Sequence, residues 1–179
     1  MIRIAKTRSF ATSMCKAQIA VAKPKLTHLT ENGDAHMVDI SQKPSTTRTA
    51  VAFGRIIFSN PDVASLITSG GMKKGDVLSV SRIAGIMAVK KTPELIPLCH
   101  TLNVSKITVD FKTNASSVDC ELVVKSSGQT GVEMEALVGV TTALNTIYDM
   151  CKAVDKAMTI TDIKILEKRG GKSDWGTSV

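Results

Sequence analysis

The chain has 179 residues, of which 43% are hydrophobic and 22% charged, as expected for one globular domain with a sizeable core. It contains no run of about 18 apolar residues, which excludes a membrane-spanning helix, and 3% aromatic residues leave few stacking platforms for single-stranded nucleic acid. Residues 1–25 hold six of the 23 basic residues and no acid, so the other 17 face 16 acidic residues, a near balance that argues against a generic nucleic-acid binder.

Residues 1–25 have the composition of a mitochondrial or plastid transit peptide. They are basic, contain Ser and Thr, lack acids, and place Arg3 and Lys6 one helical turn apart. Their apolar runs are too broken for a secretory signal, and a disordered basic arm is the alternative. We therefore expect residues 1–25 to direct the chain to the mitochondrial matrix and residues 26–179 to form a single domain.

The first half of this domain predicts one strand and two helices. Residues 26–46 show little periodicity and are expected to be extended, whereas residues 47–59 alternate as a strand does. Asn60 and Pro61 then open a short helix that Gly70 and Gly71 end. Asp76 can cap a second helix, whose apolar residues recur at helical spacing: Val77, Val80, Ile83, Ala84 and Met87.

The second half predicts a hairpin, a long helix and a last strand. Residues 102–112 and 118–125 alternate on either side of a polar turn, residues 132–156 have a helical period, and residues 159–168 alternate again. The order strand, helices, strand, strand, helix, strand is that of a split βαβ. It predicts an α+β, ferredoxin-like antiparallel sheet with helices on one face.

Three common functions of small domains lack their required residues. An RNA-recognition module needs aromatic residues on its third strand, and residues 118–125 have none. Gly171-Lys172-Ser173 ends like a phosphate loop, but Leu166 stands where that motif needs glycine. Four widely spaced cysteines without a CxxC pair predict neither a disulfide framework nor a zinc site, so we expect reduced thiols.

Several ionisable residues remain where elements begin or end. His100 closes an apolar run and could be catalytic or simply satisfy a buried carbonyl group. Glu133 and Glu135 open the long helix, where acids offset the helix dipole in any case. Asp149 and Lys152 share one helical face three residues apart, as a catalytic pair or an ordinary surface ion pair would.

At these positions the chain resembles the cyclic pyranopterin monophosphate synthases, the molybdenum cofactor biosynthesis protein C family. The matching stretches run from about residue 26 to residue 175: Ala35-His36-Met37-Val38-Asp39, Lys74-Gly75-Asp76, Leu95 to His100, Thr130 to Leu137, Ile147 to Val154, and Gly170-Gly171-Lys172-Ser173. Departures are small, with Thr101 where many relatives have proline, Val138 where threonine is frequent, and a divergent tail after Asp174. None falls on a catalytic position of the family.

The resemblance implies an enzyme of molybdenum cofactor synthesis. Such a lyase converts 3′,8-cyclo-7,8-dihydro-GTP into cyclic pyranopterin monophosphate and pyrophosphate, without a metal or redox cofactor. It is functionally coupled to the radical enzyme that makes its substrate. The resemblance also implies a homohexamer built from dimers, with each active site shared between two subunits, and neither nucleic acid nor membrane as a partner.

Matched position by position, the family motif implies three groups of site residues. Lys74 and Lys152 become the acid/base pair, with Asp149 setting the local charge. The substrate-contacting residues are Leu98, Cys99, His100, Glu133, Met134 and Glu135. The candidates for the triphosphate are Arg48, Lys168 and Lys172, since cations must surround the leaving pyrophosphate. A non-catalytic nucleotide sensor and a scaffold that passes the intermediate on remain alternatives.

Overall fold

The computed structural model of the chain describes residues 28–30 and 32–176, so the transit peptide expected at residues 1–25 lies outside the described residues. Its elements follow in the order β1 (Thr46–Ile57), α1 (Asp62–Ser69), α2 (Val77–Lys90), α3 (Thr92–Leu95), β2 (Val104–Thr113), β3 (Ser117–Gly128), α4 (Glu133–Cys151), β4 (Thr159–Arg169) and β5 (Trp175–Gly176).

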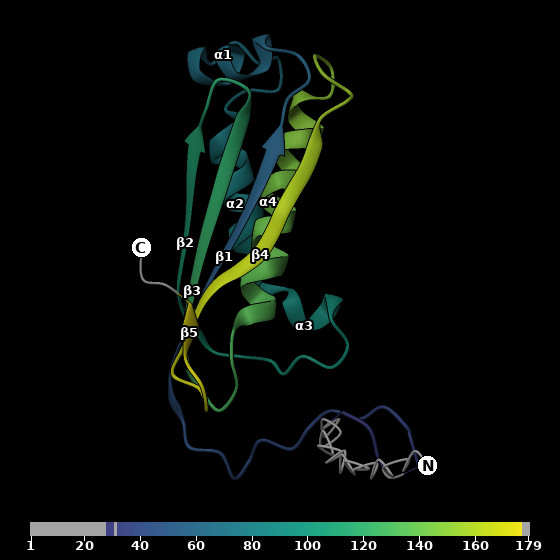
Figure 1. Cartoon of the computed structure of the whole chain (residues 1–179), viewed down its shortest axis with the longest axis vertical. Coiled ribbons are helices and arrows are strands. Elements are labelled where there is room, and N and C mark those ends of the chain that lie inside the picture. Colours follow the sequence, from purple (N-terminus) through teal and green to yellow (C-terminus); the bar gives the residue numbers. More distant parts are fainter. Residues whose placement is uncertain (1–27, 31, 177–179) are drawn as a thin grey trace, which may run out of the picture.

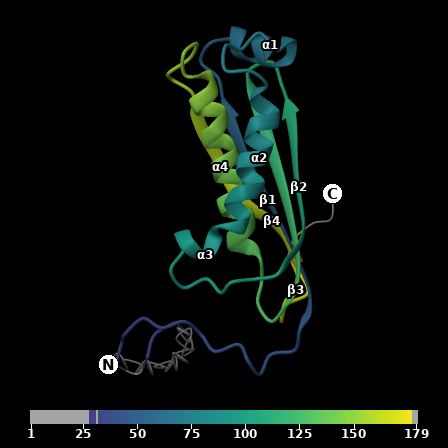
Figure 2. The ribbon, with the colours of Figure 1, turned by 180° about the vertical axis from the view of Figure 1, so that it is seen from behind.

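The strands form one antiparallel sheet in the order β2-β3-β1-β4-β5 (Figure 1). The central strand β1 pairs with β3 on one side and with β4 on the other. Figure 2 shows α2 and α4 lying side by side over one face of this sheet. The predicted ferredoxin-like arrangement, with helices on one face, is therefore confirmed.

The core lies between the sheet and these two helices. Ala50, Ala52 and Ile56 of β1 are fully buried on the helix side, while the intervening Val51 and Phe53 are half-buried on the open side. Gly54 belongs to the buried set, and a Cβ atom there would overlap the Leu144 side chain of α4. Small residues on β1 thus let α4 approach the sheet closely.

The apolar face predicted for α2 is confirmed at Val77 but is wrong at three of its other residues. Val80, Ile83 and Met87 are 47%, 61% and 46% exposed. The buried residues are Val77, Ser81, Gly85, Ala88 and Val89. The reason is close helix packing: a Cβ at Gly85 would lie 3.2 Å from the carbonyl oxygen of Gly139 in α4. A contact built from small residues carries little hydrophobic signal, and larger apolar side chains outside the contact dominate the periodicity.

The ends of the helices agree with the sequence in part. Asp76 caps α2 as predicted, accepting a hydrogen bond of 3.0 Å from the backbone N–H of Ser79. Helix α4 ends at Cys151, five residues before the expected 156, where the chain tightens into a turn in which the Val154 N–H donates to the Cys151 carbonyl three residues back. The short α3 and β5 were not predicted. In the described part of the chain, no helix is long and apolar enough to cross a membrane.

Candidate active site

The first cavity lies at the N-terminal end of α4 and has a volume of about 290 Å³. We call it the His100 cavity. It is lined by all six residues expected to contact substrate: Leu98, Cys99, His100, Glu133, Met134 and Glu135. The first three come from the loop between α3 and β2, and the last three from the first turn of α4. The fold therefore brings two distant motifs of the sequence to one cavity.

The ring of His100 has one nitrogen occupied and one available. Its Nε2 atom lies 2.9 Å from the carbonyl oxygen of Val38, and a carbonyl can only accept, so Nε2–H donates. In the neutral ring Nδ1 is then an acceptor. The histidine satisfies a carbonyl group, as one reading of the sequence expects, and also lines the cavity, while its role in catalysis stays a prediction.

Glu135 is buried in the wall of this cavity, and Cys99 beside it is half-buried. Glu135 is 3% exposed, and burial raises the pKa of its carboxyl, with a further contribution from the charge of Glu133. Burial also raises the pKa of the Cys99 thiol, and the neighbouring Glu135 adds to this. Cys99 is therefore a thiol rather than a nucleophilic thiolate at neutral pH, whereas Glu135 is suited to holding a proton.

A second cavity of about 210 Å³ gathers the three residues expected to bind a triphosphate, Arg48, Lys168 and Lys172, and we call it the Arg48 cavity. The Arg48 side chain donates 3.3 Å to the Gly128 carbonyl, which fixes its direction. Lys168 forms an ion pair of 2.8 Å with Glu133. Lys43 and Arg169 also line this cavity, which makes it strongly cationic and suited to an anionic ligand.

Lys172 reaches the Arg48 cavity on a turn that requires glycine. Gly170 has φ +85°, and a Cβ atom there would collide with the carbonyl oxygen of Thr47. The turn is held by two hydrogen bonds, from the Gly170 N–H to Asp174 at 2.8 Å and from the Thr46 hydroxyl to the Gly170 carbonyl at 2.7 Å. The glycine-rich motif therefore places Lys172 by backbone geometry.

The two cavities adjoin, because Lys43, Thr130, Gly131 and Glu133 line both of them. Sequence reasoning missed Lys43, which lies in an irregular segment. Its position depends on Gln129, whose side-chain amide donates 2.9 Å to the Lys43 carbonyl oxygen. A glutamine just before the predicted α4 motif is too weak a signal to have indicated this contact.

The three predicted catalytic residues meet at the other end of α4, and we call them the lysine cluster. Lys74 Nζ lies 2.6 Å from Asp149 Oδ2, and Lys152 Nζ lies 2.7 Å from Asp149 Oδ1. These hydrogen bonds, that of Lys152 first, lower the pKa of Asp149 to about 2. Asp149 in turn raises the pKa of Lys152. One carboxylate thus holds two exposed lysines and keeps Lys152 in its charged form.

Within one chain the lysine cluster and the cavities are far apart. Glu133 and Asp149 lie at opposite ends of α4, and their separation of 16 residues corresponds to about 24 Å at a helical rise of 1.5 Å. Figure 1 shows α1, which precedes Lys74, at one end of the helix and α3 at the other. The twelve predicted residues therefore form two groups rather than one.

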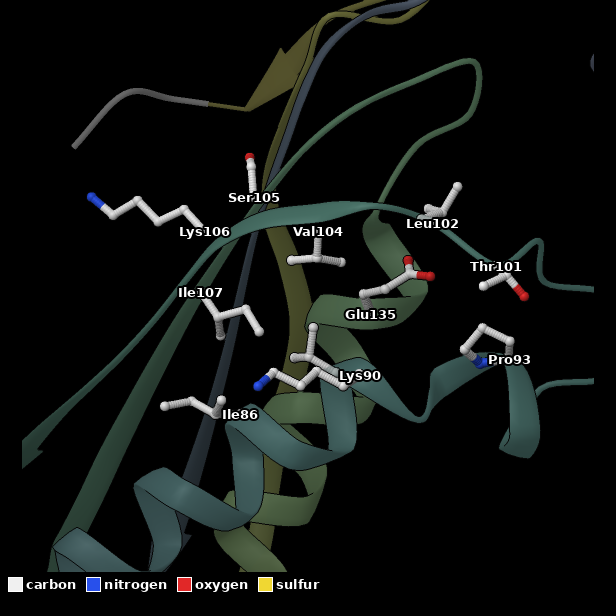
Figure 3. Close-up of a pocket in the computed structure, with 11 residues that line it drawn as sticks. Ile86, Lys90, Pro93, Thr101, Leu102, Val104, Ser105, Lys106, Ile107 and Glu135 are labelled. Carbon is white, nitrogen blue, oxygen red and sulfur yellow. The ribbon is translucent and has the colours of Figure 1, made fainter.

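A third cavity, of about 380 Å³, lies between α2 and β2 (Figure 3). Its walls combine apolar residues, Ile86, Val104 and Ile107 among them, with the charged side chains of Lys90 and Lys106. Glu135 lines this cavity as well as the His100 cavity, and in Figure 3 its carboxylate is directed toward Thr101. Glu135 therefore lies between two cavities. No residue of this cavity other than Glu135 was predicted as a site residue.

Comparison with known proteins gives consistent matches over nearly the whole body of the chain. The model of the MoaC family matches residues 37–171. A cyclic pyranopterin monophosphate synthase of Corynebacterium glutamicum is 57% identical over 152 residues, covering 84% of this chain and 97% of the relative. Enzymes of the same name from Parvibaculum lavamentivorans and Chloroflexus aggregans are each 54% identical, over 86% and 84% of this chain and 96% and 93% of their own.

Among solved structures, a de novo designed protein with a ferredoxin fold matches 73% of this chain and 94% of its own, with 15% identity and a TM-score of 0.38. Within the described residues, no group of three or more His, Cys, Asp or Glu side chains could hold a metal ion.

Proposed function

The chain belongs to the MoaC family, and we propose that it acts as a cyclic pyranopterin monophosphate synthase, a lyase of molybdenum cofactor biosynthesis. Its substrate is then 3′,8-cyclo-7,8-dihydro-GTP, and its products are cyclic pyranopterin monophosphate and pyrophosphate. The observation that carries this proposal is the joining of a polar cavity with titratable walls to a cationic one at the N-terminal end of α4.

The two cavities suit the two parts of this substrate. The Arg48 cavity supplies cations for a triphosphate, and these would stabilise the charge that develops as pyrophosphate leaves. The His100 cavity supplies groups that hydrogen-bond a purine-derived ring, including the carboxyls of Glu133 and Glu135 and the free Nδ1 atom of His100. Because Lys43 lines both cavities, it would lie near the junction between ring and phosphates.

The lysine cluster suits the proton transfers. Opening the purine-derived ring and reclosing it as a pterin requires protons to move to and from nitrogen and carbon. Lys152 and Lys74, held on the two sides of the Asp149 carboxylate, would be the acid/base pair that exchanges these protons. Asp149, with a pKa of about 2, remains ionised throughout.

We propose further that each active site forms between two copies of the chain. An acid or base must lie within about 3 Å of the proton that it moves, so groups at opposite ends of α4 cannot serve one reacting centre within one chain. A partner that brings its lysine cluster to the His100 cavity would complete the site. The exposed apolar side chains Val80, Ile83 and Met87 of α2 support association between copies of the chain. Closed two-fold dimers assembled into a hexamer would both cover such side chains and complete the active sites.

Incubating the purified chain with 3′,8-cyclo-7,8-dihydro-GTP tests the activity. We expect release of pyrophosphate together with the cyclic pterin product. Tight binding without turnover would indicate a nucleotide sensor instead, and neither binding nor turnover would leave a scaffold role. The same assay, supplied by the radical enzyme that makes the substrate, tests the expected coupling between the two reactions.

A further inference from the structure

The connection between β1 and α2 carries Lys74, and it is attached to the end of α4 at two points. One point is the exposed contact between Lys74 and Asp149. The other is Asp155, which follows α4 by four residues and is only 4% exposed. Asp155 contacts Ser59 and Asn60, the second and third residues after β1. The connection is therefore bound to the C-terminal end of α4 at two places. Ser59 and Asn60 bind it near the start of the connection, and Lys74 binds it near the end of the connection.

The carboxylate of Asp155 accepts four hydrogen bonds. Its Oδ2 atom receives the backbone N–H groups of Ser59 at 2.7 Å and Asn60 at 3.1 Å. Its Oδ1 atom receives the Ser59 hydroxyl at 2.6 Å and the Ala157 N–H at 2.9 Å. The Asn60 side-chain amide adds a bond of 3.4 Å to the Val154 carbonyl. Both oxygens are thus saturated, by donors from two separate segments of the chain.

These two attachments differ in strength. The side chains of Lys74 and Asp149 are 45% and 54% exposed, and an ion pair so open to water stabilises a structure only slightly. A pair of this kind cannot by itself hold a flexible lysine in a catalytic position. The bonds of a buried carboxylate are charge-assisted, directional and protected from water, so the precise placement of the connection comes from Asp155.

We propose that Asp155 is a positioning residue for Lys74, acting by tying the start of the β1–α2 connection to the end of α4. This inference rests on the proposed function, in which Lys74 moves protons. Val63 and Met72 also anchor the connection to the core, but apolar contacts are non-directional and tolerate shifts. Loss of Asp155 would therefore leave the connection folded and displace Lys74 relative to Asp149 and Lys152.

Kinetics of the full-length Asp155→Ala variant test this. A misplacement of about 1 Å can reduce a rate a hundredfold, so we expect kcat to fall about tenfold to a hundredfold, with KM changed less than about threefold because the cavities lie at the other end of α4. Ser59→Ala removes one of the four hydrogen bonds and should show a smaller loss. Val109→Ala, a core truncation in the edge strand β2, controls for lost stability and should keep the wild-type kcat.

A double-mutant cycle separates positioning from a general loss of stability. In a Lys74→Ala background, Asp155→Ala should lower the single-turnover rate by less than about threefold further, because the residue that it positions is absent. If the two losses multiply, or if Asp155→Ala reduces kcat no more than Val109→Ala does, the proposal is wrong.

The carboxyl of Asp149 provides a readout that does not need turnover. Carbon-13 NMR should show that its pKa rises from about 2 in Asp155→Ala, as in Lys74→Ala, because one of its two lysine partners has moved away. Val109→Ala should leave this pKa unchanged. An unchanged pKa in Asp155→Ala would contradict the positioning role. If the wild-type chain showed no turnover, the proposed function would fail, while this titration would still decide the inference.

Discussion

Lys74 and Lys152 share one carboxylate, and this sharing determines what each can do. Asp149 accepts from both ammonium groups and raises the pKa of Lys152. Because all three side chains are about half exposed, their pairing contributes little to folding. The cluster is therefore best explained by chemistry, and its members should be replaceable without loss of the fold.

We expect Lys74→Ala and Lys152→Ala each to lower turnover by about a hundredfold to ten-thousandfold, the usual loss for a positioned acid or base. The free energy of unfolding should change by less than about 0.5 kcal/mol, as for other exposed positions. Lys73→Ala, the neighbouring exposed lysine, is the matched control and should keep normal turnover. A near-normal single-turnover rate in either site variant would refute its assigned role.

Replacing Glu135 should change the stability of the fold as well as the activity, unlike replacement of the two lysines. Since burial raises the pKa of Glu135 above the ordinary 4.5, its ionised form destabilises the fold. This destabilisation disappears completely only below pH 4.5, where the carboxyl is protonated in both the folded and the unfolded chain. Glu135→Gln should therefore raise the free energy of unfolding at pH 7, by on the order of 1 kcal/mol, with the difference vanishing toward pH 4. Urea unfolding at both pH values measures this effect.

The same variant should lower kcat/KM by roughly tenfold or more, the cost of losing a charge-assisted hydrogen bond to substrate. The stability that Glu135→Gln gains over wild type should be larger at pH 7 than at pH 4. If the two gains are equal, burial does not destabilise the carboxylate.

Helix α4 and the glycine-rich turn organise the site above the level of single side chains. The first turn of α4 supplies Glu133, Met134 and Glu135, and its last turn supplies Asp149. The close contact between Gly85 of α2 and Gly139 of α4 helps to keep α4 against the sheet. The turn at Gly170 brings Lys172 into the wall of the Arg48 cavity, which Glu133 of α4 also lines.

Gly170→Ala should damage this turn specifically. The added Cβ would meet the Thr47 carbonyl at a positive φ, so we expect a loss of about 1–3 kcal/mol in the free energy of unfolding and a severalfold rise in KM, as Lys172 leaves the triphosphate. Gly33→Ala is the matched control, because Gly33 also has a positive φ, +87°, but has open space around it. Equal KM values for the two variants would rule out a role of the turn in binding.

For the molecule as a whole, the proposed shared site makes a quantitative prediction. Inactive variants of His100 and Lys152 should complement each other when subunits exchange. Random mixing makes half of the dimers mixed, and each mixed dimer holds one intact site and one doubly damaged site, so roughly a quarter of wild-type activity should return. No recovery with this pair would place both residues on one subunit. No recovery with any pair among Lys74, His100, Glu135 and Lys152 would reject the shared site.

The transit peptide expected at residues 1–25 leads to a separate prediction. We expect residues 1–25 to be dispensable for folding and to be removed in the mitochondrial matrix, because they hold six basic residues and no acid. Mass spectrometry of the mature protein from its native source would test this. An intact segment from Met1 to Lys25 would contradict the proposed location.

The sequence by itself determined the fold class and the composition of the site. Alternation along residues 47–59, 102–112 and 159–168, together with the hairpin turn, was enough to predict the antiparallel sheet, because strand period and turn chemistry are local properties. The cap at Asp76 was likewise readable. The motifs around His100, Glu135 and Lys152 predicted the candidate site residues through resemblance to the family.

Only the tertiary structure decided which face of α2 is buried and how the site residues are grouped. The α2–α4 contact depends on Gly85 and Gly139, small residues that a hydrophobic pattern does not register. Lys43 joins both cavities through a glutamine 86 residues away, and Asp155 binds Ser59 across 96 residues. Such contacts form between segments that share no local signal. Their partners are therefore set by the packing of the whole domain.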